Sequence, residues 1–198
     1  MTGATTIRPA FHHFNLKTTR LQALIDWYCT VVGAEVTFQD DMGAWLTNDG
    51  ANHRLALLAF PGFVDDPDKE TRTGMHHSAF EYNDFEELND SYLRLRDEGI
   101  EPDICLDHGM TLSYYYSDPD GNRVELQIDV FGDWAASKEW MRTSAEFHAN
   151  PIGVFVDPAK VAERAAAGDA FTEIHRLAMA GELSPPEAPI ELPGQEQA

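Results

Sequence analysis

Cysteine is scarce in this chain: the 198 residues include two, Cys29 and Cys105. Two cysteines cannot build the disulfide framework of a small secreted domain, so we expect free thiols in a reducing cytoplasm. Long apolar runs are also missing, because a stretch such as Leu55–Phe60 is far shorter than the ~20 residues of a spanning helix. The N-terminus has no secretory signal pattern. These absences predict a cytoplasmic protein without a membrane partner.

Basic residues are few as well. Lys and Arg total 14 against 34 Asp and Glu, which gives a formal net charge of −20. Such a surface repels a phosphate backbone, so nucleic acid is excluded as an expected partner. The remaining composition, 43% hydrophobic and 24% charged, is that of a folded globular protein. The length predicts one domain with an appendage.

A weak internal repeat organises the chain. Residues 11–16, FHHFNL, recur as residues 75–80, MHHSAF, and an apolar pattern of helical spacing follows each copy. Gly33 and Gly99 stand where the two helical patterns stop, the position that favours glycine after a helix. The repeat therefore predicts two related modules.

Each module is predicted to contain one helix between strands. Thr18 or Thr19 is expected to cap the first helix, and Asn83 or Asp84 the second. Short strand-like runs separated by turn residues follow each helix. The expected strands are Glu35–Gln39, Ala44–Thr47 and Arg54–Phe60 in the first module, and Ile104–Leu106, Thr111–Ser117 and Arg123–Val130 in the second.

The fold class expected from these patterns is α+β, with paired βαβββ modules that form one curved mixed sheet around a metal site. We place this domain at residues 8–130. Helical periodicity resumes afterwards, so residues 131–182 are predicted to form a helical extension, in which we recognise no chemistry. Residues 183–198, rich in proline and glutamate, are predicted to be a flexible acidic tail.

Histidine pairs open both copies of the repeat. Because strand residues alternate faces, we expect the two side chains of each pair to point to opposite sides of a sheet. Related modules then offer one equivalent histidine each, and Glu125 in a later strand is a candidate carboxylate. Two imidazoles and one carboxylate suit a divalent first-row metal, although a strand histidine can also be purely structural.

The motifs resemble those of the vicinal oxygen chelate superfamily, which includes glyoxalase I, fosfomycin-resistance proteins and type I extradiol dioxygenases. The resemblance covers roughly residues 10–130. It rests on residues 12–16 (HHFNL), 74–81 (GMHHSAFE) and 118–125 (DPDGNRVE). It implies metal ligands at His13, His77 and Glu125.

Residues outside this triad resemble the extradiol dioxygenase branch. His53, in Asn52-His53-Arg54, resembles the acid–base histidine, although Asn52 and Arg54 depart from the residues common there. Tyr115 resembles the tyrosine that hydrogen-bonds a substrate oxygen. His108 stands where dioxygenases often carry polar residues of the pocket.

The resemblance implies an Fe(II) enzyme that cleaves the ring of a small aromatic diol with O2. We also expect self-association into a homo-oligomer, since the usual partner domain is missing. Two alternatives stay open. One is a redox-silent, metal-dependent glyoxalase-like or transferase-like enzyme, and the other is a metal-free protein that binds a small aromatic compound or antibiotic.

Overall fold

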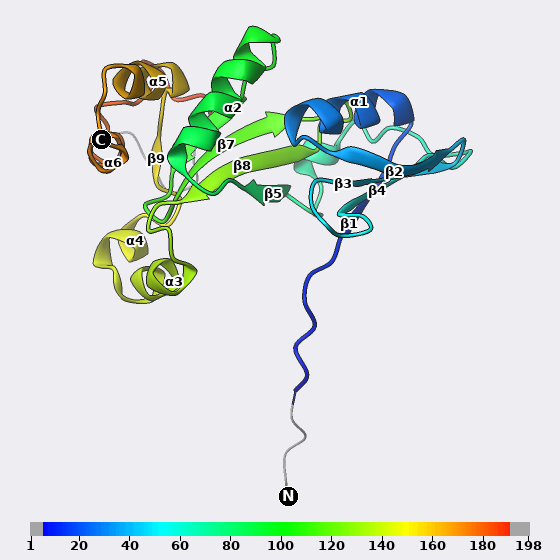
Figure 1. Ribbon diagram of the computed structural model, residues 1–198, viewed down its shortest axis with the longest axis horizontal. Coiled ribbons are helices and arrows are strands. Elements are labelled where there is room, and N and C mark those ends of the chain that lie inside the picture. The colour runs from blue at the N-terminus through cyan, green and yellow to red at the C-terminus, as the bar shows by residue number, and fades with distance from the viewer. Residues whose placement is uncertain (1–5, 191–198) are drawn as a thin grey trace, which may run out of the picture. The chain divides into compact units, whose positions relative to one another are not determined.

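The computed structural model describes residues 6–190 (Figure 1). These residues form two compact units. The first holds the chain up to Gly74 together with the turn Asp118–Gly121, and the second holds Met75–Ser117 and the chain from Asn122 onward. Residues 191–198 of the predicted tail lie outside the described residues.

The first unit is a βαβββ module. Its strands hydrogen-bond in the order β1-β4-β3-β2, with β1 parallel to β4 and the other pairs antiparallel. Its elements are β1 (Phe14–Lys17), α1 (Leu21–Val31), β2 (Glu35–Asp40), β3 (Gly43–Thr47), β4 (Leu55–Leu58) and the short helix η1 (Lys69–Thr71).

The second unit repeats the module and adds the C-terminal helices. Its sheet has the order β5-β8-β7-β6-β9, again with one parallel pair, β5 and β8. Its elements are β5 (His77–Glu81), α2 (Phe85–Asp97), β6 (Ile104–Asp107), β7 (Thr111–Ser117), β8 (Arg123–Asp129), α3 (Trp134–Thr143), α4 (Ala145–Ala149), β9 (Val154–Phe155), α5 (Pro158–Ala166) and α6 (Phe171–Met179).

The α+β class and the paired βαβββ modules are confirmed, but the sheet differs from the expectation. The described strands form two sheets, one in each module, instead of one mixed sheet. The reason is local: every strand of a module finds its hydrogen-bond partners within the same compact unit. None of the helices within residues 6–190 has the length and apolar character that a bilayer crossing needs.

Helix ends follow the sequence signals in part. Gly33 and Gly99 adopt the left-handed conformation just beyond α1 and α2, as predicted. Asp84 caps α2, because its side chain accepts a hydrogen bond from the Glu87 amide. The expected threonine cap of α1 is wrong: Arg20 is the cap residue, and the Thr18 hydroxyl accepts from the Arg20 amide.

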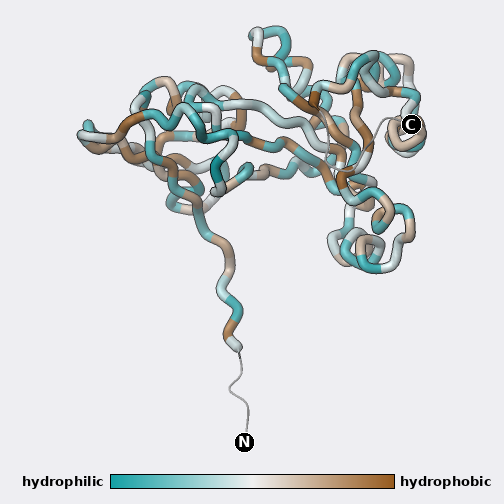
Figure 2. The backbone as a smooth tube through the Cα atoms, turned by 180° about the vertical axis from the view of Figure 1, so that it is seen from behind, coloured by the Kyte–Doolittle hydropathy of each residue, from teal (hydrophilic) through white to brown (hydrophobic). Residues whose placement is uncertain are grey.

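In the second unit, α2 packs on one face of the sheet and buries the apolar residues there. Leu88 and Leu95 of the helix are buried, as are Tyr114 and Leu126 of the strands below. Figure 2 shows apolar, brown stretches along these strands, in contrast to the paler turns of α3 and α4. Strand alternation turns the neighbouring residues, Tyr115 among them, to the opposite face of the sheet.

Candidate metal and catalytic site

The pairing register of the second sheet gathers polar residues on the face opposite α2. Glu125 on β8, which lies between β5 and β7, pairs with Ala79 of β5 on one side and with Tyr115 of β7 on the other. His77 opens β5 two residues before Ala79 and therefore shares this face. The sheet itself thus places His77, Glu125 and Tyr115 together.

His77 and Glu125 are in direct contact. The distance from His77 Nε2 to Glu125 Oε2 is 3.0 Å. Two ligand atoms that lie at right angles, each about 2.1 Å from one metal ion, are about 3.0 Å apart. At 3.0 Å the two side chains also make an ordinary hydrogen bond, so the distance shows that an imidazole and a carboxylate, both possible metal ligands, lie side by side.

Glu125 is buried, yet its surroundings favour the charged form. Burial raises the pKa of Glu125, but hydrogen bonds from His77, Ser113 and Tyr115 outweigh it and hold the pKa below its ordinary value. An ionised carboxylate is the form that ligates a cation. Its state at neutral pH thus suits a metal ligand.

Tyr115 connects Glu125 to His108. The Tyr115 hydroxyl donates to Glu125 Oε1 at 2.9 Å and lies 2.9 Å from His108 Nε2. Burial and the nearby Glu125 charge raise the pKa of Tyr115, so the hydroxyl keeps its proton. On the other side of the His108 ring, Nδ1 is 2.7 Å from the Ile152 carbonyl. A carbonyl only accepts, so Nδ1 carries the proton.

His108 is neutral in this environment. Burial lowers the pKa of His108, and the neighbouring Glu125 charge offsets that effect only in part. With the proton on Nδ1, the Nε2 atom of the neutral ring is an acceptor. The single Tyr115 proton therefore faces two acceptors, His108 Nε2 and Glu125 Oε1.

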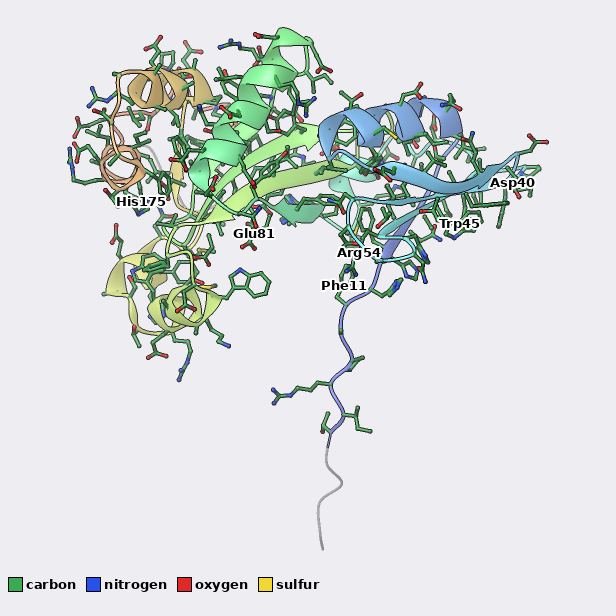
Figure 3. All side chains as sticks on the ribbon, in the orientation of Figure 1. Phe11, Asp40, Trp45, Arg54, Glu81 and His175 are labelled. Carbon is green, nitrogen blue, oxygen red and sulfur yellow. The ribbon has the colours of Figure 1, made fainter. Side chains whose placement is uncertain are left out.

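The first unit holds a separate cluster of three histidines. One ring nitrogen from each of His12, His13 and His53 lies within 4.8 Å of the others. Arg54, labelled in Figure 3, donates to the His12 carbonyl at 2.9 Å, and its guanidinium pairs with Asp49. Arg54, the residue directly before β4, therefore holds the segment that carries His13.

His53 has a defined tautomer. Its Nδ1 lies 2.7 Å from the Asn52 side-chain oxygen, which only accepts, so Nδ1 carries the proton and Nε2 is left as a base. Burial, together with the nearby rings of His13 and His12, lowers the pKa of His53 and favours this neutral form. Its ring lies 4.3 Å from that of His13, measured between centroids. The predicted base and a predicted ligand are therefore neighbours.

The expected orientation of the histidine pairs is wrong. The Nδ1 atoms of His12 and His13 are 3.0 Å apart, and those of His76 and His77 are 2.8 Å apart, so the rings of each pair meet. His12 and His76 precede the strands, and strand alternation does not apply to them. The pairing engages Nδ1 of each predicted ligand and leaves its Nε2 for another contact.

The structure brings the predicted residues together in two groups. His77, Glu125, Tyr115 and His108 are contiguous within the second unit, and His13 and His53 lie together within the first. Imidazole and carboxylate are donors that first-row divalent metals accept, so each group by itself offers ligand atoms that suit such an ion. From the sequence, Asn52 stood out only as a departure from the family pattern, and its contact with His53 was missed because it depends on side-chain geometry. The Ile152 carbonyl was also missed, because it reaches His108 across 44 residues.

Comparison with known proteins adds a family and relatives. The model of the Glyoxalase/Bleomycin resistance protein/Dioxygenase superfamily matches residues 10–126. The chain is 39% identical to biphenyl-2,3-diol 1,2-dioxygenase 2 of Rhodococcus globerulus over 91% of its length and 94% of that protein. It is also 39% identical to biphenyl-2,3-diol 1,2-dioxygenase 3 of the same organism, over 88% and 92%.

A solved structure supports the fold. A glyoxalase/dioxygenase from Nostoc punctiforme superposes with a TM-score of 0.52 at 24% identity and covers 65% of this chain and 99% of its own. At that identity the likeness concerns the fold alone.

Proposed function

The chain belongs to the glyoxalase/bleomycin resistance protein/dioxygenase superfamily, and on that premise we propose that it is an Fe(II)-dependent extradiol dioxygenase. Its substrates are a small catechol-type diol and O2. The proposal is supported by the two Rhodococcus globerulus relatives, which are biphenyl-2,3-diol 1,2-dioxygenases by name. The observation that carries it is the contact between two possible metal ligands, His77 and Glu125, together with the Tyr115 hydroxyl, which donates to the same Glu125 carboxylate.

The proposed ligands are His77, Glu125 and His13. A set of two histidines and one carboxylate leaves coordination positions open, as in non-haem Fe(II) oxygenases. When bound, the iron supplies the redox chemistry that lets a diol react with O2.

The reaction balances without an external reductant. One diol and one O2 give one product that retains all their atoms. The ring bond between a hydroxylated carbon and its unhydroxylated neighbour breaks, the O–O bond breaks, and both oxygen atoms enter the product. The diol supplies the electrons that reduce O2.

His53 and Tyr115 handle protons and orientation in this proposal. His53 is neutral with a free Nε2, so it can accept a proton from the diol near neutral pH and later return it. Tyr115 keeps its hydroxyl proton and can turn it from one of its two present partners to a substrate oxygen. The buried floor around Tyr115, formed by Ile104 and Leu106, excludes water from this side.

The test is oxygen uptake by protein loaded with Fe(II) under anaerobic conditions, then mixed with 2,3-dihydroxybiphenyl or catechol in air. We expect uptake with the appearance of a coloured ring-opened product. His77→Ala abolishes both, whereas His148→Ala, a change at an exposed histidine of the extension, retains them. Binding of the diol without uptake or colour contradicts the oxygenase and favours a redox-silent enzyme or a binding protein.

A further inference from the structure

The turn that joins β6 to β7 is held by the C-terminal extension, residues 131–182. Asp107, the last residue of β6, and His108 and Gly109, which follow it in the turn, each contact a different part of it. We call this set of contacts the extension clamp. All of its residues belong to the second unit.

Asp107 contacts α6. Its side chain is fully buried, with Oδ2 2.7 Å from His175 Nδ1 and Oδ1 accepting from the Gly109 amide at 2.8 Å. Figure 3 labels His175 on α6. A buried carboxylate needs such partners, because an unpaired one is costly. The pair therefore fixes α6 on the turn.

Glycines allow the backbones to approach closely. Gly153, with φ of +88°, lies against the turn so tightly that an added Cβ would stand 2.0 Å from the Asp107 carbonyl oxygen. A Cβ on Gly109 would stand 2.4 Å from the Trp140 ring of α3. The short strand β9 continues from Gly153 and pairs with β6, Val154 opposite Asp107. The extension is thus fitted to the turn along its backbone.

The close approach of Gly153 brings the preceding carbonyl to His108. Ile152 O accepts from His108 Nδ1 at 2.7 Å, which leaves Nε2, 2.9 Å from the Tyr115 hydroxyl, as the unprotonated nitrogen. Tyr115 in turn donates to Glu125. A path of contacts therefore runs from the extension to the carboxylate proposed as a ligand.

We propose that the C-terminal extension positions the His108 imidazole, holding it in the tautomer and orientation that present Nε2 to Tyr115. Ile152 supplies the direct contact through its carbonyl, and the Asp107–His175 pair and Gly153 keep that carbonyl in place. The expected effect of this positioning on turnover rests on the proposed dioxygenase function. The positioning of the His108 ring by the extension does not depend on that function.

The test compares His175→Leu with His175→Gln in the full-length chain. Leucine removes the donor to Asp107, whereas glutamine keeps an N–H that can replace it. We expect His175→Leu to lower kcat about tenfold or more with little change in KM, as for other partners that orient ligand groups. His175→Gln retains most of the wild-type kcat. His148→Gln, at an exposed histidine of the same extension whose Nε2 contacts the Met141 carbonyl, leaves kcat unchanged.

A second readout does not depend on activity. Long-range proton–nitrogen NMR of the iron-free chain reports which ring nitrogen of His108 is protonated. We expect Nδ1 in the wild type and in His175→Gln, and a mixture of tautomers in His175→Leu. Gly153→Ala, which pushes the Ile152 carbonyl away, gives the same mixture and covers the case in which His175→Leu does not fold.

The outcomes separate the two proposals. If the chain consumes no O2 but the NMR shifts appear as expected, the dioxygenase proposal fails and the positioning role stands. If the chain is an active dioxygenase and the His108 tautomer and kcat are the same in all four variants, the positioning role is wrong.

Discussion

Three consecutive tyrosines of β7 differ sharply in their hydrogen bonds. The difference predicts that replacing a tyrosine by phenylalanine raises the free energy of unfolding at some of these positions and lowers it at another. Tyr115 donates to the buried Glu125 carboxylate at 2.9 Å. The hydroxyls of Tyr114 and Tyr116 are buried without a hydrogen-bond partner among the described residues. Replacing each tyrosine by phenylalanine removes one oxygen atom and changes the packing little.

The magnitudes follow from these partners. A hydrogen bond to a charged group contributes about 2 kcal/mol, so Tyr115→Phe should lower the free energy of unfolding by that amount. For a chain of this length the Tm falls by about 4–8 °C. Tyr114→Phe removes a buried, unpaired hydroxyl and should raise the free energy of unfolding by about 1 kcal/mol.

The assay is thermal and urea unfolding of the three variants and the wild type in one buffer. Tyr116→Phe should behave as Tyr114→Phe does. Equal destabilisation by Tyr114→Phe and Tyr115→Phe would refute the reasoning, because the effect would then come from ring packing and not from the bond to Glu125.

The remaining predictions concern His53, its partner and a helix cap. His53→Phe should leave iron binding intact, measured by metal analysis, and slow turnover about 100-fold, because the proposed general base is lost; unchanged turnover removes that role. Asn52→Ala should lower kcat, whereas Asn52→Asp should retain more of it because it keeps an acceptor for His53 Nδ1. Equal kcat values in the two variants would contradict the inference that Asn52 holds the proton of His53 on Nδ1. Asp84→Ala should lower the free energy of unfolding, measured by urea denaturation, by about 1 kcal/mol, because the Glu87 amide loses its hydrogen-bond acceptor. An unchanged free energy of unfolding would show that water replaces the Asp84 carboxylate.

Local signals in the sequence were sufficient for most of the fold. The glycines that end α1 and α2, the Asp84 cap and the alternating strands act over a few residues, so their effects can be predicted from neighbours alone. The internal repeat extended this to the two modules. The predicted residues of the second unit, His77, Glu125 and Tyr115, meet because alternation on paired strands determines which face each occupies.

Contacts between distant residues could not be predicted in the same way. Strand β9 has two residues and exists through its pairing with β6, which no periodicity reveals. His175 and Asp107 are 68 positions apart, and the helical extension therefore carried no recognisable chemistry in the sequence. The division into two sheets likewise depends on which strand edges meet, a property of the folded chain.

The central claim is that the chain inserts both atoms of O2 into a diol. The most direct measurement is mass spectrometry of the product formed from 2,3-dihydroxybiphenyl by the Fe(II)-loaded protein under oxygen-18 gas, quenched within the first turnovers. The account predicts a ring-opened product that carries both labelled atoms. A product with one labelled atom, or an unchanged diol, would contradict it.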